Sequence, residues 1–498
     1  MTGNTPHQAR FGARAAAVIL AGQWSRYIVQ IISVATLSRL VAPEDFGLIA
    51  IAMGIVLLAS IVGDLGLSTA CLQRSVITTE QRSNLFWINT GLGAAFSILF
   101  NLAAPWIATL FGYPELRALC HLISPVFLLN GIRAQYQVNA SRMGLFGRIS
   151  VADAAGSLCG FAVAVALVLT TDAGAIALAA QQLVTAFVAL IIIVAHERWI
   201  PGLPRRGVGT RSIVSFGAML FVTHLVGALN WNIDSLALGW YQPAAMVGFY
   251  GRANQISSQP IQQTAVPLTR LALPRIAQAG DDPAARFAAA KAVHAPIAFV
   301  CAAFMSAVAA NGELAGRIIL GPQWTGVGVI ITILSLGALV QISGYFNYWI
   351  LTASGNGGVL LRSELVPRLL IVAAVIVCAR VSVVAVAAAM ATLQLLMFLS
   401  YLFYALPRVG VSLRAAVRTS LENTWYFIVL AVAAPVLSTL AERSLGLGST
   451  AALAADALLW IAGALLCLLV PSCRRRLAGI LALVTTRLAP RFFSRSPR

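Results

Sequence analysis

The stretch LSRLVAPEDFGLIAIA at residues 37–52 has a counterpart in LALGWYQPAAMVGFYGRA at residues 236–253. Pro43 and Gly47 of the first stretch match Pro243 and Gly248 of the second, at an offset of about 200 residues. In each copy we expect an apolar helix to end, a proline to start a tight turn and a glycine to open the returning helix. The match predicts an internal repeat. The sequence around each copy then indicates the kind of fold that is repeated.

Apolar runs surround both copies and continue along all 498 residues, and each run is long enough to cross a bilayer. Hydrophobic residues make up 59% of the chain and charged residues 10%, whereas a soluble domain carries about 25% charged residues. The composition excludes a soluble domain and predicts an all-α, polytopic membrane protein. The predicted spans are fourteen, at residues 14–40, 46–71, 84–111, 117–140, 149–171, 174–195, 212–240, 245–271, 289–311, 324–352, 358–379, 383–406, 425–441 and 450–470.

Six spans separate the two copies of the repeat, so both halves have the same orientation, as in transporters built from parallel repeats. We predict two lobes of six spans each and two peripheral spans. The predicted divisions are a cytoplasmic N-terminus at 1–13, an N-lobe at 14–196, a basic linker at 197–211, a C-lobe at 212–406, a second basic linker at 407–424, the peripheral spans at 425–470 and a basic tail at 471–498.

The formal net charge of +18 comes from arginines in short connections and in the tail. These arginines lie in connections on the same side as the N-terminus, whereas acidic residues such as Glu44, Asp45 and Glu313 lie in the opposite connections. The positive-inside rule therefore predicts that both termini are cytoplasmic. The same distribution indicates anionic lipid as the partner of the basic residues and argues against nucleic acid.

The sequence offers no sign of an enzyme. Connections between spans do not exceed about 20 residues, and no GxxxxGK[ST] motif is present for ATP. The histidines and the seven cysteines are dispersed, without a metal-ligand or disulfide pattern. We therefore expect a transporter without a cofactor or a metal, driven by an ion or substrate gradient.

Polar side chains recur at helical spacing inside several spans. Such groups are costly in lipid and normally face the interior of a bundle or a water-filled cavity. We predict that they line a hydrated cavity of positive potential. The set is Gln23, Arg26 and Gln30 in the first span, Arg133 and Gln137 in the fourth, and Arg252, Gln255, Gln259 and Gln262 in the eighth, where Pro260 is expected to bend the helix.

Two aspartates have a second interpretation. Asp234 and Arg252 lie nine residues on either side of Pro243, so an equal rise places them at the same depth. A structural ion pair is therefore as good an interpretation of Asp234 as a role in ion coupling. The same alternative applies to Asp64, which flanks the first turn opposite Arg26.

Other charged residues are interpreted individually. Arg133 has no obvious acidic partner in the sequence, which favours a place in the cavity. Arg362, Glu364 and Arg368 open the eleventh span, and we interpret them as snorkelling towards the cytoplasmic interface.

Three stretches resemble the polysaccharide transport family of the multidrug/oligosaccharidyl-lipid/polysaccharide exporter superfamily. They are LSRLVAPEDFGLIAIA, DLGLSTACLQR from Asp64 and NIDSLALGWYQPAAMVGFYGRANQISSQP from residue 232 to Pro260. The resemblance covers most of the chain and weakens after about residue 410. It implies two six-helix lobes and a flippase of the bacterial inner membrane that carries undecaprenyl-diphosphate-linked oligosaccharides to the periplasmic leaflet. It also implies polysaccharide polymerase and chain-length machinery as partners.

Three other functions remain open. An ion-coupled multidrug exporter of the same superfamily would share the lobes, but an acidic or aromatic cavity would suit its cations better than arginines. A flippase for the peptidoglycan precursor lipid II is close in mechanism. A membrane-bound polymerase or ligase would need a sizeable periplasmic loop with polar catalytic residues, which this sequence lacks.

Overall fold

The computed structural model describes residues 27–64, 67–73, 77–171, 174–197, 199–210, 213–215, 233–280, 282–422, 424–445, 449–467, 469–470, 473–474 and 477. These residues form helices joined by turns, and no strand occurs among them. The chain divides into two compact units. The first comprises residues 1–252, 319–324 and 374–386, and the second comprises residues 253–318, 325–373 and 387–498.

Within the described residues, seven helical segments are long and apolar enough to cross a membrane, or eight if the bent pair 413–440 is counted as one span. The seven are Thr79–Phe111, Glu115–Arg142, Phe146–Thr170, Gly174–Glu197, Pro283–Ala310, Val327–Ala353 and Val383–Arg408. Each coincides with a predicted span. The chain is thus a polytopic all-α membrane protein, as its composition predicts, while the full number of fourteen spans stays a prediction.

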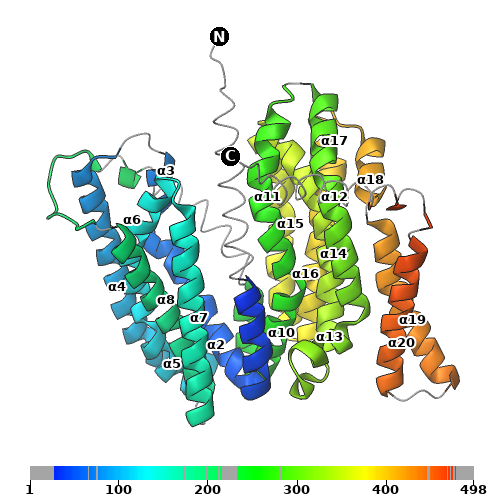
Figure 1. Ribbon diagram of the computed structural model, residues 1–498, viewed down its shortest axis with the longest axis horizontal. Coiled ribbons are helices and arrows are strands. Elements are labelled where there is room, and N and C mark those ends of the chain that lie inside the picture. Colours follow the sequence, from blue (N-terminus) through cyan, green and yellow to red (C-terminus); the bar gives the residue numbers. More distant parts are fainter. Residues whose placement is uncertain are drawn as a thin grey trace, which may run out of the picture. The chain divides into compact units, whose positions relative to one another are not determined.

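The first unit contains a bundle in which α4 lies along α6 and α7 lies along α8 (Figure 1). Glycines allow the backbones of these helices to approach closely, as is common inside membranes. A Cβ on Gly131 of α6 would lie 2.4 Å from the carbonyl oxygen of Asn89 on α4. The helices are α2 (Pro43–Asp64), α3 (Leu67–Gln73), α4 (Thr79–Phe111), α5 (Glu115–Ile123), α6 (Pro125–Arg142), α7 (Phe146–Thr170) and α8 (Gly174–Glu197).

Residues 199–209 of the predicted basic linker 197–211 are irregular, and they are bonded to the first turns of α4. Asn84 donates a hydrogen bond of 2.7 Å to the Arg205 carbonyl and accepts one of 2.8 Å from the Arg205 amide. Gln81 reaches the Val208 carbonyl at 2.8 Å. These bonds hold the linker against the end of the bundle.

The boundary between the compact units lies at residue 252 and not in this linker. The reason is that the described helix 233–241 and the start of α10 (Ala244–Ser257) pack against α2. Leu236 contacts Gly54, and Ile51 contacts Gly239. The assignment of six spans to each lobe remains a prediction.

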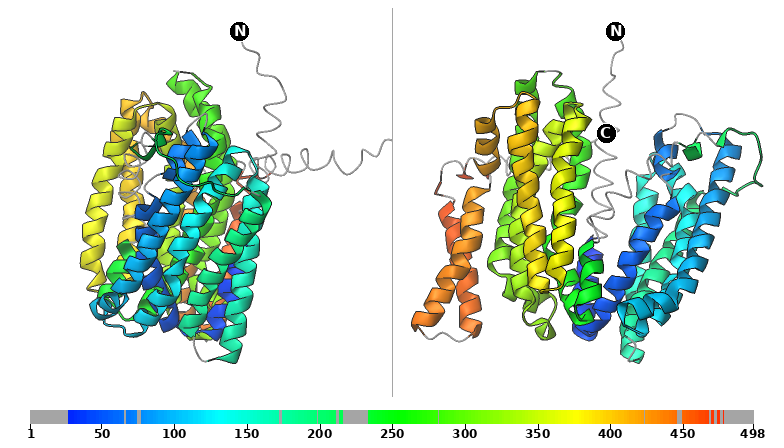
Figure 2. Two further views of the ribbon diagram at one scale, coloured as in Figure 1. Left: turned by 90° about the vertical axis from the view of Figure 1, so that its left-hand side faces the viewer. Right: turned by 180° about the vertical axis from the view of Figure 1, so that it is seen from behind.

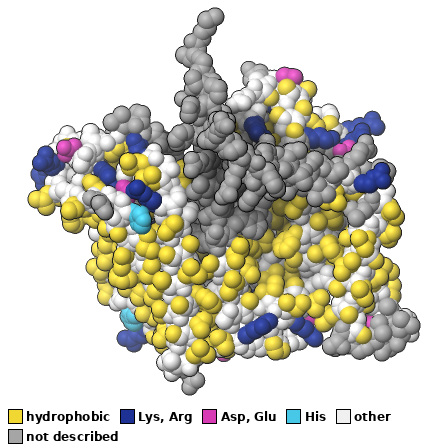
Figure 3. Space-filling view, in the orientation of Figure 1, with side chains coloured by type: hydrophobic (Ala, Val, Ile, Leu, Met, Phe, Trp, Pro, Cys, Tyr) yellow, Lys and Arg dark blue, Asp and Glu magenta, His cyan; other side chains and the backbone are white. Residues whose placement is uncertain are grey.

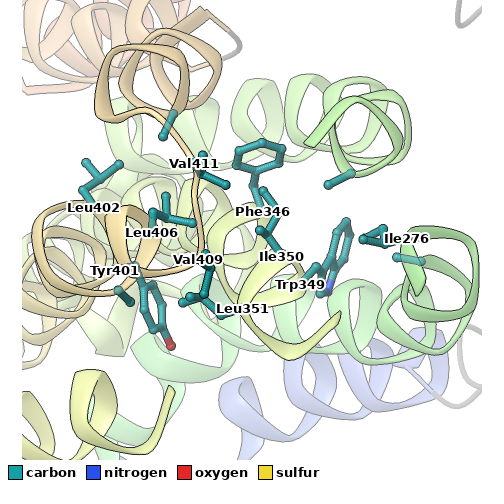
Figure 4. Close-up of a cluster of buried hydrophobic side chains, with 14 residues drawn as sticks. Ile276, Phe346, Trp349, Ile350, Leu351, Tyr401, Leu402, Leu406, Val409 and Val411 are labelled. Carbon is teal, nitrogen blue, oxygen red and sulfur yellow. The ribbon is translucent and has the colours of Figure 1, made fainter. Parts of the chain in front are cut away.

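The second unit is built around α14, which packs against α12 and α11. Figure 4 shows Phe346, Trp349 and Ile350 of α14 in a buried cluster that also takes in Leu406 and Val411. Figure 2 shows α19 and α20 as an orange hairpin. The elements from α11 on are α11 (Gln259–Ala277), α12 (Pro283–Ala310), α13 (Gly312–Ile319), α14 (Val327–Ala353), α15 (Gly357–Ala379), α16 (Val383–Ser400), the π-helix η2 (Tyr401–Ala405), α17 (Leu406–Arg408), α18 (Leu413–Glu422), α19 (Trp425–Leu445) and α20 (Ser449–Cys467).

Candidate functional site

The two repeat turns contact each other directly in the first unit. A Cβ on Gly47 would lie 1.7 Å from the Ala244 carbonyl oxygen, and a Cβ on Gly248 would lie 2.1 Å from the Pro43 carbonyl oxygen. Neither position can hold a side chain unless the backbone moves. The matched glycines therefore allow the first turns of α2 and α10 to cross at backbone contact, a role that the sequence pattern did not reveal.

Asp234 is buried beside this crossing, with 2% of its surface exposed. Its Oδ2 accepts a hydrogen bond of 2.6 Å from the hydroxyl of Tyr250, and its Oδ1 accepts one of 2.7 Å from the Ser235 amide. The ion pair with Arg252 that equal depth suggested is not formed. Asp234 instead joins helix 233–241 to α10 through a fully buried tyrosine.

Arg252 points to a different helix. Its guanidinium carbon lies 4.3 Å from the centre of the Phe46 ring, a cation–π distance. Phe46 also contacts the ring of Trp324 at 5.6 Å between centroids. Arg252 therefore links α10 to α2 through an aromatic pair, close to the glycine crossing.

Two further segments of the first unit pack around the crossing. Trp324 of η1 (Pro322–Trp324) donates a hydrogen bond of 2.7 Å to the Ser38 carbonyl, and Gln323 reaches the Val41 carbonyl at 3.0 Å. Gln242 donates 2.8 Å to the Ala379 carbonyl. We call residues 38–47, 241–252, 319–324 and 379–380 the turn cluster. Side chains bonded to backbone carbonyls hold its four segments together.

Arg133 has an acidic partner, which corrects the expectation from the sequence. Its Nη2 forms an ion pair with Oδ1 of Asp153 on α7. The two side chains are 14% and 20% exposed, so the pair is partly buried. Nε of Arg133 is buried and makes no hydrogen bond with any described residue. The guanidinium is thus oriented by Asp153 and keeps unused donor capacity.

The remaining predicted residues of the first unit are less informative. Gln23 and Arg26 lie outside the described residues. Asp64 ends α2, and its side chain is outside the described part of the chain. Gln30 and Gln137 are both partly buried.

The polar stripe of the eighth span is interrupted. Helix α10 ends at Ser257, and α11 begins at Gln259 with Pro260 in its first turn, so the helical assignment is interrupted at Ser258, next to the predicted bend at Pro260. Gln255 before the break is buried, whereas Gln259 is partly buried and Gln262 is exposed. The three amides of this stretch therefore differ in their access to solvent.

Glu364 and Arg368 are bonded to each other, and Glu364 is also bonded to η2; their interpretation as snorkelling side chains stays a prediction. Arg368 donates a hydrogen bond of 2.9 Å to one carboxylate oxygen of Glu364, and the Tyr401 hydroxyl donates one of 2.8 Å to the other oxygen. Arg362 is exposed, as a snorkelling side chain would be. Proline at 367 and the π-helical turn at Tyr401 adjoin this network.

One cavity of about 20 Å³ lies between α11, α12 and α14, within the described part of the second unit. Its lining includes His294, Tyr345 and Thr264. Nε2 of His294 lies 2.8 Å from the Ile342 carbonyl and so carries the proton, while Nδ1 has no partner among the described residues. A volume of this size suits one water molecule and is too small for a sugar.

The sequence from 36 to 329 matches the family described as polysaccharide biosynthesis protein. The chain is 27% identical over 252 residues to the teichuronic acid biosynthesis protein TuaB of Bacillus subtilis, covering 50% of this chain and 52% of TuaB. It is 25% identical to the lipopolysaccharide biosynthesis protein WzxC of Escherichia coli, covering 51% of each chain. It is 27% identical to the succinoglycan biosynthesis transport protein ExoT of Rhizobium meliloti, covering 67% of each. The matches to TuaB and WzxC span about half of those relatives.

Two solved structures share the fold. The lipid II flippase MurJ in an inward closed conformation is similar with a TM-score of 0.67 at 12% identity, covering 91% of this chain and 99% of MurJ. The eukaryotic transporter AtDTX14 is similar with a TM-score of 0.52 at 14% identity, covering 83% of this chain and 98% of AtDTX14. At these identities the likeness concerns the fold alone. The match over residues 36–329 covers more than half of the sequence, and the chain belongs to the polysaccharide biosynthesis protein family.

Proposed function

We propose that this protein is a flippase that moves undecaprenyl-diphosphate-linked oligosaccharide repeat units from the cytoplasmic to the periplasmic leaflet of a bacterial inner membrane. The observation that carries the proposal is the family match in a chain made of membrane-length helices. The name of ExoT links this family to transport during polysaccharide synthesis. The names of TuaB and WzxC link it to two further polysaccharides.

The partly buried arginines suit a diphosphate head group. Guanidinium groups form paired, charge-assisted hydrogen bonds with phosphate oxygens, and these bonds are stronger where water is scarce. Arg133 is oriented by Asp153, and its side chain stays 14% exposed, which leaves it within reach of a phosphate oxygen. In the proposed mechanism Arg133 and Arg252 attract the diphosphate, and the accessible amides of Gln259 and Gln262 contact the sugars.

Alternating access would carry the head group across while the polyprenyl chain stays in lipid. With both termini cytoplasmic, the turn cluster lies at the periplasmic end of its helices. Reporter fusions to the C-terminus and to the loop at Gly112 test this topology, since the two positions should report opposite sides. Polysaccharide polymerase and chain-length machinery are the expected partners downstream.

Two other functions make different demands on the same chain. A multidrug exporter would bind cations, and the partly buried arginines oppose such cargo. A lipid II flippase would carry a similar diphosphate, so the cargo chemistry alone does not separate the two functions. Loss of a lipid II flippase would be lethal, whereas loss of a flippase for a surface polysaccharide would remove only that polymer.

The decisive experiment deletes the gene and assigns undecaprenyl-linked oligosaccharides to a leaflet of the inner membrane. Accumulation on the cytoplasmic leaflet, together with loss of a surface polysaccharide, is the expected result. Unchanged lipid-linked pools with an intact surface polymer would overturn the proposal.

Substitutions at Arg133 then separate binding from folding. Arg133→Lys keeps the positive charge beside Asp153 but loses the planar fork of donors, so export should fall about tenfold with normal protein levels. Arg117→Gln is the matched control, because Arg117 is exposed and should export like the wild type. Normal export by Arg133→Lys would show that export does not need the guanidinium fork at this position.

A further inference from the structure

Helix α18 differs from the membrane-length helices of the second unit because its two long faces differ sharply in polarity. Ala416, Thr419 and Ser420 on one face are buried. The hydroxyl of Ser343 on α14 donates to the Ser420 carbonyl at 3.4 Å, which fixes this face against the bundle. The opposite face is exposed and carries Arg414 and Arg418.

The two arginines follow each other at i and i+4, so their side chains lie on the same face about 6 Å apart. Arg418 donates a hydrogen bond of 2.6 Å to Glu422. Glu422 also accepts a hydrogen bond of 3.2 Å from Lys291 of α12. Arg414 makes no hydrogen bond or ion pair with any described residue. One acid therefore faces two cations, and Arg414 adds a charge that no neighbouring acid offsets.

A further arginine extends this surface. Arg408 of α17 is exposed and is held by its own helix, with its guanidinium 3.9 Å from the ring centre of Tyr404 and bonded to the Tyr404 carbonyl at 2.6 Å. Figure 3 shows basic side chains gathered over the end of the second unit that carries α17 and α18. We call Arg408, Arg414 and Arg418 the basic face.

The surface next to the basic face is apolar. Leu421 of α18 and Trp425 at the start of α19 are 44% and 50% exposed, and Phe403 of η2 is also exposed. Farther along α19, most exposed side chains are aliphatic, including Val429, Val436 and Leu440. The change from exposed arginines to exposed apolar side chains marks the depth at which head groups give way to hydrocarbon, and tryptophan is typical of that level.

We propose that the basic face of α17 and α18 is a binding site for the head groups of anionic phospholipids. Arginine forks match a phosphodiester, and the adjoining apolar side chains suit the acyl chains of the same lipid. The bound lipid holds α18 at the membrane surface, where α18 meets α19. This site does not depend on the proposed cargo, since it lies on the outside of the second unit.

The test compares lipid binding by two single variants of the full chain. Each purified protein is placed in nanodiscs made of equal parts phosphatidylcholine and phosphatidylglycerol. The protein is then released from the nanodisc in the mass spectrometer, and native mass spectrometry counts the phosphatidylglycerol molecules that stay bound to it. Arg414→Gln should lower its apparent affinity about fivefold, since each arginine near an anionic surface contributes a comparable factor. Arg117→Gln, which removes an exposed arginine from α5 of the first unit, should bind as the wild type does.

Three results would overturn the proposal. The first is equal retention of phosphatidylglycerol by the wild type and Arg414→Gln. The second is an equal loss in Arg117→Gln, which would indicate a response to net charge alone. The third is weaker binding of added undecaprenyl diphosphate with unchanged phosphatidylglycerol, which would assign the basic face to the cargo. If Arg414→Gln is poorly recovered, Arg408→Gln provides the same comparison, because Arg408 is also exposed.

Discussion

Two helical hairpins of the first unit present the same pattern in the sequence but are held together differently. Asp153 and Arg133 lie ten residues on either side of Met143, between α6 and α7. Asp234 and Arg252 lie nine residues on either side of Pro243. The first pair forms an ion pair, whereas in the second hairpin Asp234 bonds to Tyr250 and Arg252 lies on Phe46.

The difference teaches that equal rise fixes depth but not direction around the helix axis. Two residues at one depth meet only if both side chains point at the partner helix. Tyr250 is two residues before Arg252, a rotation of about 200° on an α-helix. The side of α10 that faces Asp234 therefore carries the tyrosine, and the arginine faces α2.

The largest expected effect concerns the glycine crossing that only the second hairpin makes with α2. Gly248→Val should cost more than ~3 kcal/mol, because the new Cβ would meet the Pro43 backbone and not a movable side chain. Gly251→Ala on the same helix is the control, since its nearest neighbour is 4.0 Å away. Protein retained in the membrane and thermal unfolding in detergent give the measurement. Equal stability of both variants would show that the backbone contact between Gly248 and Pro43 does not hold the second hairpin against α2.

The next effect tests the buried hydrogen bond of Asp234. Tyr250→Phe should destabilise the protein by ~2 kcal/mol, because a carboxyl group without access to water loses one of its two donors. Tyr241→Phe should change stability little, since Tyr241 is 40% exposed. Thermal unfolding of the two variants side by side makes the comparison. A stable Tyr250→Phe variant would show that Asp234 finds another partner, and Arg252 would be the first to examine.

The ion pair of the other hairpin should contribute less. A double-mutant cycle of Arg133→Gln and Asp153→Asn should give a coupling of ~1 kcal/mol, because both side chains are partly exposed and part of the attraction is offset by desolvation. Added salt should reduce this coupling and leave the effect of Tyr250→Phe unchanged. A coupling near zero would mean that Arg133 and Asp153 are held apart from each other in the membrane.

The comparison also shows what a sequence of this kind can predict. Hydropathy placed the spans at 174–195, 358–379 and 383–406 within a few residues of the helices, because burial in lipid selects whole runs of apolar side chains. The repeat at Pro43 and Pro243 was visible for a different reason, because tight turns need particular residues such as proline and glycine.

Partners of charged groups were harder to predict. Applying the equal-depth argument to Met143 would have found Asp153 as the partner of Arg133, but the same argument gives the wrong partner for Asp234. The predicted polar stripe of the eighth span also differs in exposure along its length, from the buried Gln255 to the exposed Gln262. Side-chain direction depends on helix packing, which periodicity in one helix does not contain.

The smallest expected effect concerns Arg252 and distinguishes a stacked arginine from a paired one. A double-mutant cycle of Phe46→Leu and Arg252→Gln should show a coupling of ~0.7 kcal/mol, the size of a cation–π contact with limited exposure to water. The control cycle replaces Phe249, which contacts Trp324 at 5.4 Å but has no cation–π contact with Arg252 among the described residues. Phe249→Leu with Arg252→Gln should be additive. If both cycles are additive, the arginine is held by other groups, and the second hairpin is joined to α2 through its glycines alone.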